Sequence, residues 1–294
     1  MRMIDEIRVF LEANGFGCSL QMRHGVETIS ARQSEGGRPG TVIPLEFRSK
    51  TSGEAEAESS HILEALRMVK GMDEATLIIP EDRWNRQTEM MKARVLAHLE
   101  IFTPVYARNC EVRRIDKPTA AEFLSRTHAY GDAACKYRYG MFLKRSTGHI
   151  AKEGRCDIHA GTLIAVGTFS NARKWVKEDR TIRSYEWVRF ASLPGLRISG
   201  GMGKILNAFI EEVQPDDIMS YADLEWSEGT VYEQLGFTLE GQKEPVLFGI
   251  DSEWNRSPVK PGMTDSDVIA VQTGNLFYMN FGSNKYRLKL TEYE

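Results

Sequence analysis

The sequence predicts an α/β fold divided into two domains, residues 1–105 and residues 106–294. Strand-like and helical patterns alternate in both parts, and such alternation is typical of α/β proteins. The composition is that of a globular protein, with 41% hydrophobic and 27% charged residues. A chain of 294 residues is also long enough to bury two cores.

Residues 184–237 show this alternation most clearly. Residues 184–190 alternate aromatic and polar side chains, as a half-buried strand does. A glycine-rich turn at residues 199–204 leads into a helix with one apolar face, which ends before Pro215. Residues 218–222 then predict a buried strand, and residues 228–235 predict a short helix.

The glycine turn is a candidate anion site. Glycines before a helix leave backbone N–H groups uncovered at the positive end of the helix dipole, where a phosphate binds favourably. The alternative is a tight corner with no ligand, because Gly200-Gly201-Met202-Gly203 is a weak motif by itself.

The segment after this turn resembles the last motif of the GNAT acyltransferase superfamily, through Tyr232 and the run Leu235-Gly236-Phe237. In that superfamily the glycine turn holds the pyrophosphate of acyl-CoA. The resemblance therefore implies acetyl-CoA or another acyl-CoA as cofactor, bound by Arg197, Gly200, Gly201, Gly203 and Lys204. The turn departs from the usual spacing, since Met202 interrupts the glycines.

A set of motifs within residues 106–290 occurs in one order: 107–112, His128 with Gly131, 163–169, Tyr185-Glu186, Arg189-Phe190, Gly200-Gly201 with Lys204, 220–223, Trp226-Ser227 and Gly229. As an ordered set, these residues resemble the GNAT-like domain of phage and mobile-element homing endonucleases. They are also similar to the phage DNA-modification protein Mom, which alters adenine. This resemblance implies a mixed, mostly antiparallel sheet flanked by helices, a transferase acting on a nucleic-acid base, and DNA as partner.

Acyl transfer to an amine needs a base for the amine proton and an acid for the leaving thiolate. Glu186 is the candidate base, because partial burial in a strand raises a carboxyl pKa. The alternative is a buried partner for Arg189 or Arg183. The resemblance implies that Tyr232 is the acid, and the alternative for Tyr232 is core packing.

Two further residues are candidates for catalysis or base binding. The resemblance to Mom includes a histidine at the position of His128, although a lone histidine is often a surface or packing residue. Asp223 follows a strand at its carboxyl end, where it can bind an exocyclic amine or cap the next turn. We expect Glu186, Asp223 and Tyr232 to face one cleft beside the glycine turn.

Charge is distributed unevenly along the chain. Residues 109–205 carry 18 Lys and Arg against 9 Asp and Glu, whereas residues 206–294 carry 6 against 16. The basic part predicts contacts with a phosphate backbone, and its aromatic residues predict base stacking. Pairing between the two parts is the alternative. The candidate nucleic-acid-binding residues are Arg173, Lys174, Trp175, Arg189, Trp226 and Ser227.

The first domain invites comparison with a metal-dependent nuclease. Its candidate ligands are Glu27, Glu46, His61 and the pair Glu81-Asp82. The usual acidic-x-lysine spacing is missing, so we predict no metal site and a degenerate domain that positions DNA.

The remaining features concern location and redox state. No run of 18 apolar residues occurs, and acids near the first residue argue against a signal peptide, so we expect a cytoplasmic protein without membrane contact. The four cysteines are widely spaced and predict free thiols.

Three functions therefore stay open, and the oligomeric state is not predicted. The first is a GNAT-like transferase that modifies a nucleic-acid base. The second is an endonuclease or DNA-binding protein whose GNAT-like domain only recognises nucleic acid. The third is an acyl-CoA-dependent N-acetyltransferase of a protein or small amine.

Overall fold

The structure, a computed structural model, describes residues 1–33, 39–70, 75–151, 154–177, 180–227, 229–272 and 274–293. The chain forms two compact units of noncontiguous sequence. Unit 1 comprises Met1–Glu100, Asp223–Glu228 and Lys243–Ser283, and unit 2 comprises Ile101–Ala222, Gly229–Gln242 and Asn284–Glu294. This division differs from the expected one at residue 105, because two later stretches join the N-terminal unit.

Unit 1 contains a four-stranded sheet in the order β1-β2-β3-β4. Strands β3 and β4 are parallel, so the helix α2 between them forms the crossover that parallel neighbours require. Strand β1 was not expected from the sequence. The elements are α1 (Met3–Glu12), β1 (Phe16–Arg23), β2 (Val26–Gln33), β3 (Gly40–Leu45), α2 (Ser52–Lys70), β4 (Ala75–Pro80), α3 (Glu81–Arg86) and α4 (Thr88–His98).

A second, three-stranded sheet in unit 1 has the order β17-β16-β18. The strand patterns at residues 245–250 and 275–279 predict strands that close the sheet of the C-terminal domain. This prediction is wrong, because β16 and β18 pair with each other in a separate sheet. Their apolar side chains share a core with β3 and α2, which includes Ile43, Ile62, Ile250 and Tyr278. The elements of this part are β16 (Leu247–Ile250), β17 (Arg256–Pro258), α8 (Asp265–Gln272) and β18 (Leu276–Met279).

Unit 2 is built on an eight-stranded sheet in the order β15-β19-β14-β12-β10-β7-β6, with β11 paired to β12. The pairs β6–β7, β7–β10, β10–β12 and β11–β12 are antiparallel, whereas β12–β14 is parallel. The expected mixed α/β fold with antiparallel-rich sheets and flanking helices is confirmed. The strands of this sheet are β6 (Cys110–Arg114), β7 (Tyr137–Leu143), β10 (Leu163–Phe169), β11 (Arg173–Lys177), β12 (Arg180–Ser192), β14 (Asp217–Asp223), β15 (Thr238–Lys243) and β19 (Ser283–Lys289).

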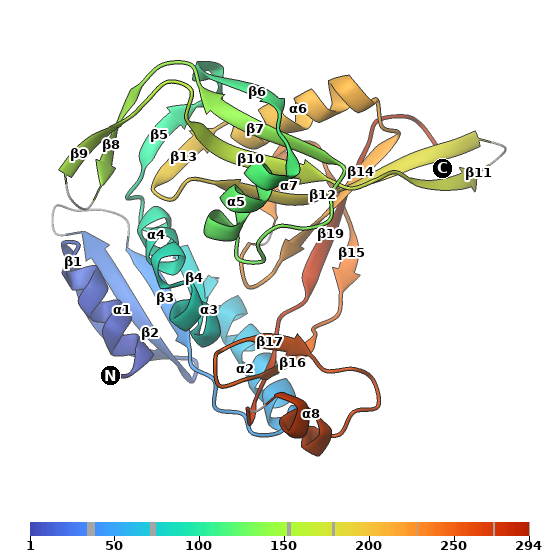
Figure 1. Ribbon diagram of the computed structural model, residues 1–294. Helices are drawn as coiled ribbons and strands as arrows, with labels where there is room; N and C mark the ends of the chain where they lie inside the picture. Colours follow the sequence, from blue (N-terminus) through green and yellow to red (C-terminus); the bar gives the residue numbers. More distant parts are fainter. Residues whose placement is uncertain are drawn as a thin grey trace. The chain divides into compact units, whose positions relative to one another are not determined.

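Helices pack on both faces of this sheet (Figure 1). On one face, Phe209 stacks on Phe169 with ring centroids 3.9 Å apart, in the main core of the unit. On the other face, Phe123 and Leu124 pack on Val166. Two smaller paired-strand elements complete the unit. The additional elements are β5 (Thr103–Tyr106), the 3₁₀ turn at Ala107–Asn109, α5 (Lys117–Thr127), β8 (Thr147–Ala151), β9 (Gly154–Ile158), β13 (Leu196–Ser199), α6 (Gly201–Val213) and α7 (Thr230–Gln234).

Strand β19 lies inside the sheet, between β15 and β14. Charged and apolar residues alternate over residues 285–290, which predicts an edge strand guarded by its charges. This prediction is wrong, because β19 has a neighbouring strand on each side. Lys285 and Arg287 instead form ion pairs with Glu240 of β15. The charge alternation therefore reflects pairing across strands.

No helix within the described ranges is long and apolar enough to cross a membrane. Cys18, Cys110 and Cys135 are free thiols, as expected, and the side chain of Cys156 lies outside the described part.

Candidate functional site

The parallel strands β12 and β14 pair over three residues only. Ser184 pairs with Asp217, Tyr185 with Ile218, and Glu186 with Met219. Beyond this point β12 stays paired with β10, while β14 has β19 as its other neighbour. The two central strands of unit 2 therefore lose their mutual backbone hydrogen bonds near the middle of the sheet.

Ser220 bridges the strands where the pairing stops. Its Oγ lies 2.9 Å from the backbone oxygen of Trp187 and 2.8 Å from the hydroxyl oxygen of Tyr232. A carbonyl oxygen only accepts hydrogen bonds, so when Ser220 donates to Trp187 its oxygen receives the proton of Tyr232. The Tyr232 hydroxyl is thereby held beside the gap.

Tyr232 lies in helix α7 with its ring in the core. The ring stacks on Tyr286 at 5.3 Å between centroids and meets Trp187 and Phe237 edge-on. Burial raises the pKa of Tyr232. A phenol is already protonated at neutral pH, so the Tyr232 hydroxyl carries a proton that it can donate.

Helix α6 leads into β14 and starts without a side-chain cap. Its N-cap, Gly200, has φ 75° in the left-handed region that suits glycine, and within the described ranges it has no side-chain cap hydrogen bond. Gly200 and Ser199 are exposed, whereas Gly201 is buried. The positive end of this helix of 13 residues therefore begins beside exposed backbone, where an anion is favoured.

The other predicted cofactor residues have structural roles. A Cβ on Gly201 would lie 2.8 Å from Ile198, and one on Gly203 would lie 3.2 Å from Leu235, so these glycines permit close packing. Lys204 donates to the backbone oxygens of Ala107 and Cys110 at 2.9 and 2.6 Å.

Arg197 remains accessible beside this turn. It is exposed on β13 and lies over the ring of Phe102, 5.0 Å from its centroid. Of the predicted cofactor residues, Arg197 and Gly200 are thus the ones exposed beside the start of α6.

Glu186 and Tyr232 lie on opposite faces of the sheet. Tyr185 and Trp187 pack in the same core as Tyr232, so alternation along β12 directs the half-buried Glu186 to the other face. We expected Glu186, Asp223 and Tyr232 to face one cleft. This expectation is wrong for Glu186 and Tyr232, which lie on opposite faces of the sheet.

The face that carries Glu186 also carries the loop after α5. His128 accepts a hydrogen bond at Nδ1 from the N–H of Tyr130, at 3.1 Å. Arg189 donates from Nε to the backbone oxygen of Gly131, at 3.1 Å, and therefore anchors the same loop. His128 and Arg189 therefore both hold the loop of residues 128–131.

Asp223, Trp226 and Ser227 belong to unit 1. Asp223 Oδ1 accepts from the N–H of Glu225 at 2.9 Å, which is the turn-capping role considered as an alternative. The ring of Trp226 lies under the guanidinium of Arg94, 3.7 Å from the ring centroid. Backbone N–H groups of Trp226 and Ser227 donate to the Asp223 oxygen, so all three residues build one turn.

The candidate nuclease carboxylates of unit 1 are occupied by other groups. Glu27 and Glu46 form ion pairs with Arg2 and Arg48. Glu81 accepts from the N–H of Phe47 at 2.7 Å. Within the described part of the chain, no group of three His, Cys, Asp or Glu residues is arranged to hold a metal ion.

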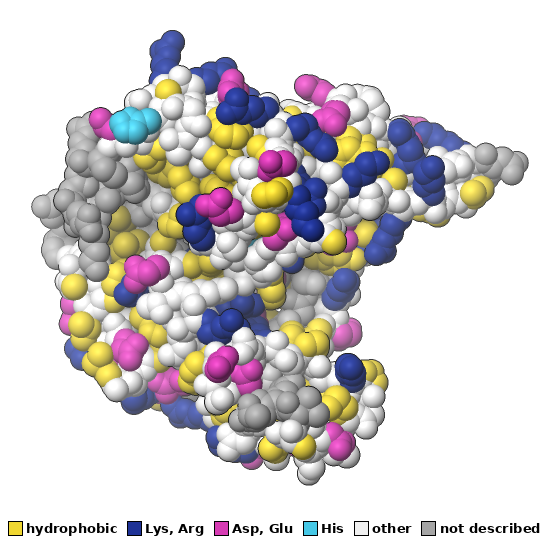
Figure 2. Space-filling model, in the orientation of Figure 1, with side chains coloured by type: hydrophobic (Ala, Val, Ile, Leu, Met, Phe, Trp, Pro, Cys, Tyr) yellow, Lys and Arg dark blue, Asp and Glu magenta, His cyan; other side chains and the backbone are white. Residues whose placement is uncertain are grey.

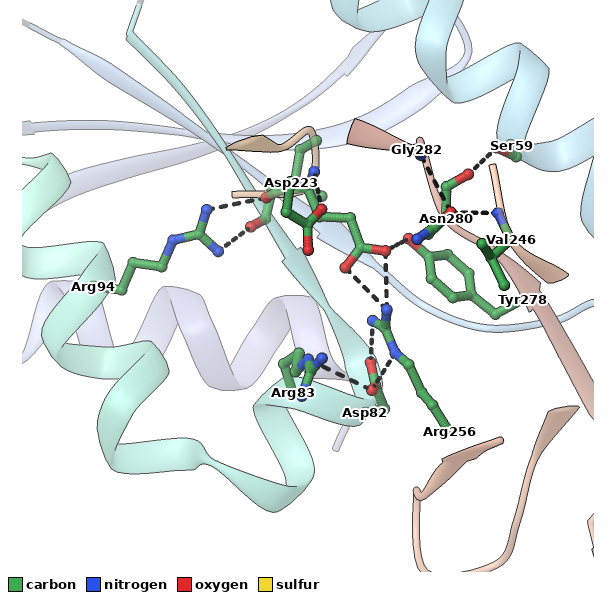
Figure 3. A network of polar contacts seen from close by, with 12 residues as sticks. Ser59, Asp82, Arg83, Arg94, Asp223, Val246, Arg256, Tyr278, Asn280 and Gly282 are labelled. Atoms are coloured by element: carbon green, nitrogen blue, oxygen red, sulfur yellow. Dashed lines mark hydrogen bonds and ion pairs between the residues drawn. The ribbon is translucent and has the colours of Figure 1, made fainter. Parts of the chain in front are cut away.

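Asp82 belongs to a buried charged network instead (Figure 3). Arg256 donates to both oxygens of Asp82 at 2.6 and 2.8 Å and to Glu225 at 2.9 and 3.0 Å. The hydroxyl of Tyr278 donates to Glu225 at 2.6 Å. Each carboxylate is matched by a cation or a hydroxyl, which indicates a structural role.

Three residues of the site were missed by sequence reasoning. Ser220 was named only within a motif, although a hydroxyl in a buried strand run was a usable signal. Arg138 and Thr168 align with Arg189 across three strands, on the face that carries Glu186. Arg138 Nε is buried and has no hydrogen-bond partner in the described ranges.

No family model matches the sequence, and the search of curated proteins found no match. Solved structures with some likeness include an acetyltransferase from Corynebacterium glutamicum, related to histone acetyltransferases, with 10% identity and a TM-score of 0.34 over 63% of this chain and 98% of that one. A GNAT-family acetyltransferase from Bacillus anthracis has 12% identity and a TM-score of 0.30 over 62% and 95%.

A third structure is a tyrosine-to-phenylalanine mutant of the AtaT toxin bound to the C-terminus of the antitoxin AtaR and acetyl-CoA. It has 12% identity and a TM-score of 0.26 over 58% of this chain and 93% of that one. None of these three is an endonuclease or a Mom protein. At such TM-scores the likenesses carry no weight for the activity of this chain.

Proposed function

We propose that the chain is an acyl-CoA-dependent N-acyltransferase of the GNAT kind, with an amine of a protein or small molecule as acceptor. The observation that carries this proposal is the gap between β12 and β14, where Ser220 holds the hydroxyl of Tyr232. The uncapped start of α6 belongs to the helix that joins these strands. The motif resemblance independently implies a GNAT-like donor site at the same residues.

Acyl transfer forms a bond from the amine nitrogen to the thioester carbonyl and breaks the carbon–sulfur bond. Tyr232 would give its proton to the leaving thiolate, since a phenol is protonated at neutral pH. The N–H groups of the first turn of α6 would hold the pyrophosphate, together with Arg197. The amine proton would pass to solvent, because Glu186 lies on the opposite face of the sheet from Tyr232.

The test introduces a negative charge at the start of α6. Ser199 is exposed, so Ser199→Asp leaves the core untouched, and a carboxylate near a helix start stabilises the helix by about 0.3–1 kcal/mol. Repulsion of a diphosphate should weaken coenzyme A binding at least about tenfold, which corresponds to about 1.4 kcal/mol. Ser199→Asn is the neutral control of the same size.

Isothermal titration with acetyl-CoA gives the result. We expect binding by the wild type and Ser199→Asn and weak binding by Ser199→Asp. Absence of binding by the wild type, or equal binding by both variants, would overturn the proposal.

A nucleic-acid base is the second candidate acceptor. The exposed cations of β11 favour it, since they offer contacts for a phosphate backbone. Mass spectrometry of nucleosides from cells expressing the protein tests this acceptor. An acyl mass shift that disappears in Tyr232→Phe would support the base, and a shift only in proteins or small amines would exclude it.

A further inference from the structure

Strand β11 and the paired part of β12 form a two-stranded ribbon at one end of unit 2 (Figure 1). Its register places like charges directly opposite each other: Lys174 faces Arg183, and Lys177 faces Arg180. Directly opposed like charges destabilise a strand pair. An anion bound between these positive charges would reduce their repulsion and so stabilise the strand pair.

Within the described ranges, the carboxylate that pairs with these cations, Asp216, contacts cations of β12. Asp216 accepts from Arg180 at 3.0 Å and from the backbone N–H of Arg183 at 2.8 Å, and its carboxylate lies 3.6 Å from the Arg183 guanidinium. The cations of β11, namely Arg173, Lys174 and Lys177, form no ion pair with any residue of the described ranges. Glu178 and Asp179, which stand between β11 and β12 in the sequence, lie outside those ranges.

The ribbon also exposes aromatic and apolar surface between these cations. Trp175 is 37% exposed and Val176 is 71% exposed. Alternation along β11 puts Arg173 and Lys177 on the same face as Trp175. Figure 2 shows Lys and Arg side chains gathered along this part of the molecule.

Cations that flank an exposed aromatic ring match the chemistry of a nucleic-acid strand. The cations contact phosphates, and the ring offers a face on which a base stacks. A two-stranded ribbon also has the dimensions of the DNA major groove. We propose that the β11–β12 ribbon binds the phosphate backbone of nucleic acid, independently of acyl transfer.

The test uses the full chain and removes the three positive charges of β11, which form no ion pair within the described ranges. The ribbon variant is Arg173→Gln, Lys174→Gln and Lys177→Gln together. The matched control is Lys117→Gln, Arg126→Gln and Lys260→Gln, which removes the same charge from exposed positions elsewhere. A third variant, Arg173→Lys with Lys174→Arg and Lys177→Arg, keeps the charge.

The measurement is fluorescence anisotropy of labelled single-stranded and duplex DNA over a salt series. The DNA is about 20 nucleotides long, which exceeds the roughly 4–16 nucleotides of a typical single-strand site. The wild type, the control and the charge-preserving variant should bind within about threefold of one another. The ribbon variant should bind at least about tenfold more weakly. On duplex DNA its salt slope should also be shallower by about 2–3, since each phosphate contact contributes about 0.9.

If single-stranded and duplex DNA bind with different affinities, the tighter-binding form is the preferred ligand, and this result supports the proposal. Equal losses in the ribbon and control variants would overturn it, since net charge alone would then explain binding. Absence of DNA binding by the wild type, or tighter binding of polyglutamate than of DNA, would overturn it as well.

Discussion

Arg256 and Asp82 are separated by 174 positions in the sequence and form a buried two-point ion pair in unit 1. Their side chains are 7% and 3% exposed. Burial lowers the pKa of Arg256, but Glu225 and Asp82 outweigh that effect and raise it overall. The pair therefore ties residues 243–283 to the N-terminal stretch.

We predict that Arg256→Met destabilises the protein by about 3–5 kcal/mol, because the carboxylates of Asp82 and Glu225 would be left buried without their cation. Urea unfolding measures the change. Arg126→Met is the control, since Arg126 forms an exposed pair with Glu122 that contributes about 0.3–0.5 kcal/mol. Equal effects of the two substitutions would show that the network contributes little.

Ser220→Ala tests the position of the Tyr232 hydroxyl. The substitution leaves a buried phenol without its partner and should destabilise the protein by about 1–3 kcal/mol. If Tyr232 is the acid, kcat should fall in both Ser220→Ala and Tyr232→Phe, while acetyl-CoA binding stays within about twofold in both.

Tyr139→Phe is the matched control, because Tyr139 is a buried tyrosine of the same core whose hydroxyl donates to Glu212. We expect its kcat to be unchanged. Unchanged turnover in Tyr232→Phe would remove this residue from the mechanism.

Glu240 links the stability of unit 2 to pH. Hydrogen bonding from Arg287 is the largest cause that lowers the pKa of Glu240 from its ordinary 4.5 to about 2. A depressed carboxyl pKa stabilises the folded state above the unfolded pKa, and the benefit is lost as pH falls through the folded pKa. The contribution should therefore be complete above about pH 5 and disappear toward pH 2.

Glu240→Gln should accordingly be less stable than the wild type at pH 6, and the difference should shrink as the pH falls. The Glu240 side chain is 38% exposed, so salt should also reduce the difference. Thermal unfolding over this pH range measures both effects. A constant difference between the two proteins would contradict the assignment.

Local patterns predicted the elements near the gap well. Residues 184–190 and 218–222 are parts of β12 and β14, and the glycine turn begins α6. Strands and helices bury apolar side chains at different intervals along the chain, and these intervals can be read from the sequence. The glycine turn also has a local cause, because Gly200 adopts positive φ.

Pairing partners and side-chain roles were less predictable. A period of two identifies a strand but not its neighbour, so β16, β18 and β19 were placed incorrectly. Lys204 binds the carbonyl oxygens of Ala107 and Cys110, and Asp223 caps a turn. Such roles depend on contacts between residues that are brought together by folding. The spacing of residues along the chain does not predict these contacts.

Helix α6 approaches the sheet closely at Gly167. A Cβ at this position would lie 2.5 Å from Cγ2 of Ile205, which is fully buried in α6. Gly167→Ala should therefore destabilise the protein by about 1–3 kcal/mol through overpacking. Gly241→Ala is the control in the same sheet, because its Cβ would meet nothing within 4 Å. This control should be neutral or stabilise the protein by up to about 1 kcal/mol.

A double-mutant cycle with Ile205→Ala separates overpacking from a backbone effect. Ile205→Ala alone should cost about 2–5 kcal/mol, since it opens a cavity in the core. Because the new methyl group at residue 167 fills part of that cavity, the double variant should be more stable than the sum of the single effects predicts. Additive losses in urea unfolding would show that the glycine is required for its backbone conformation, and the packing explanation would then fail.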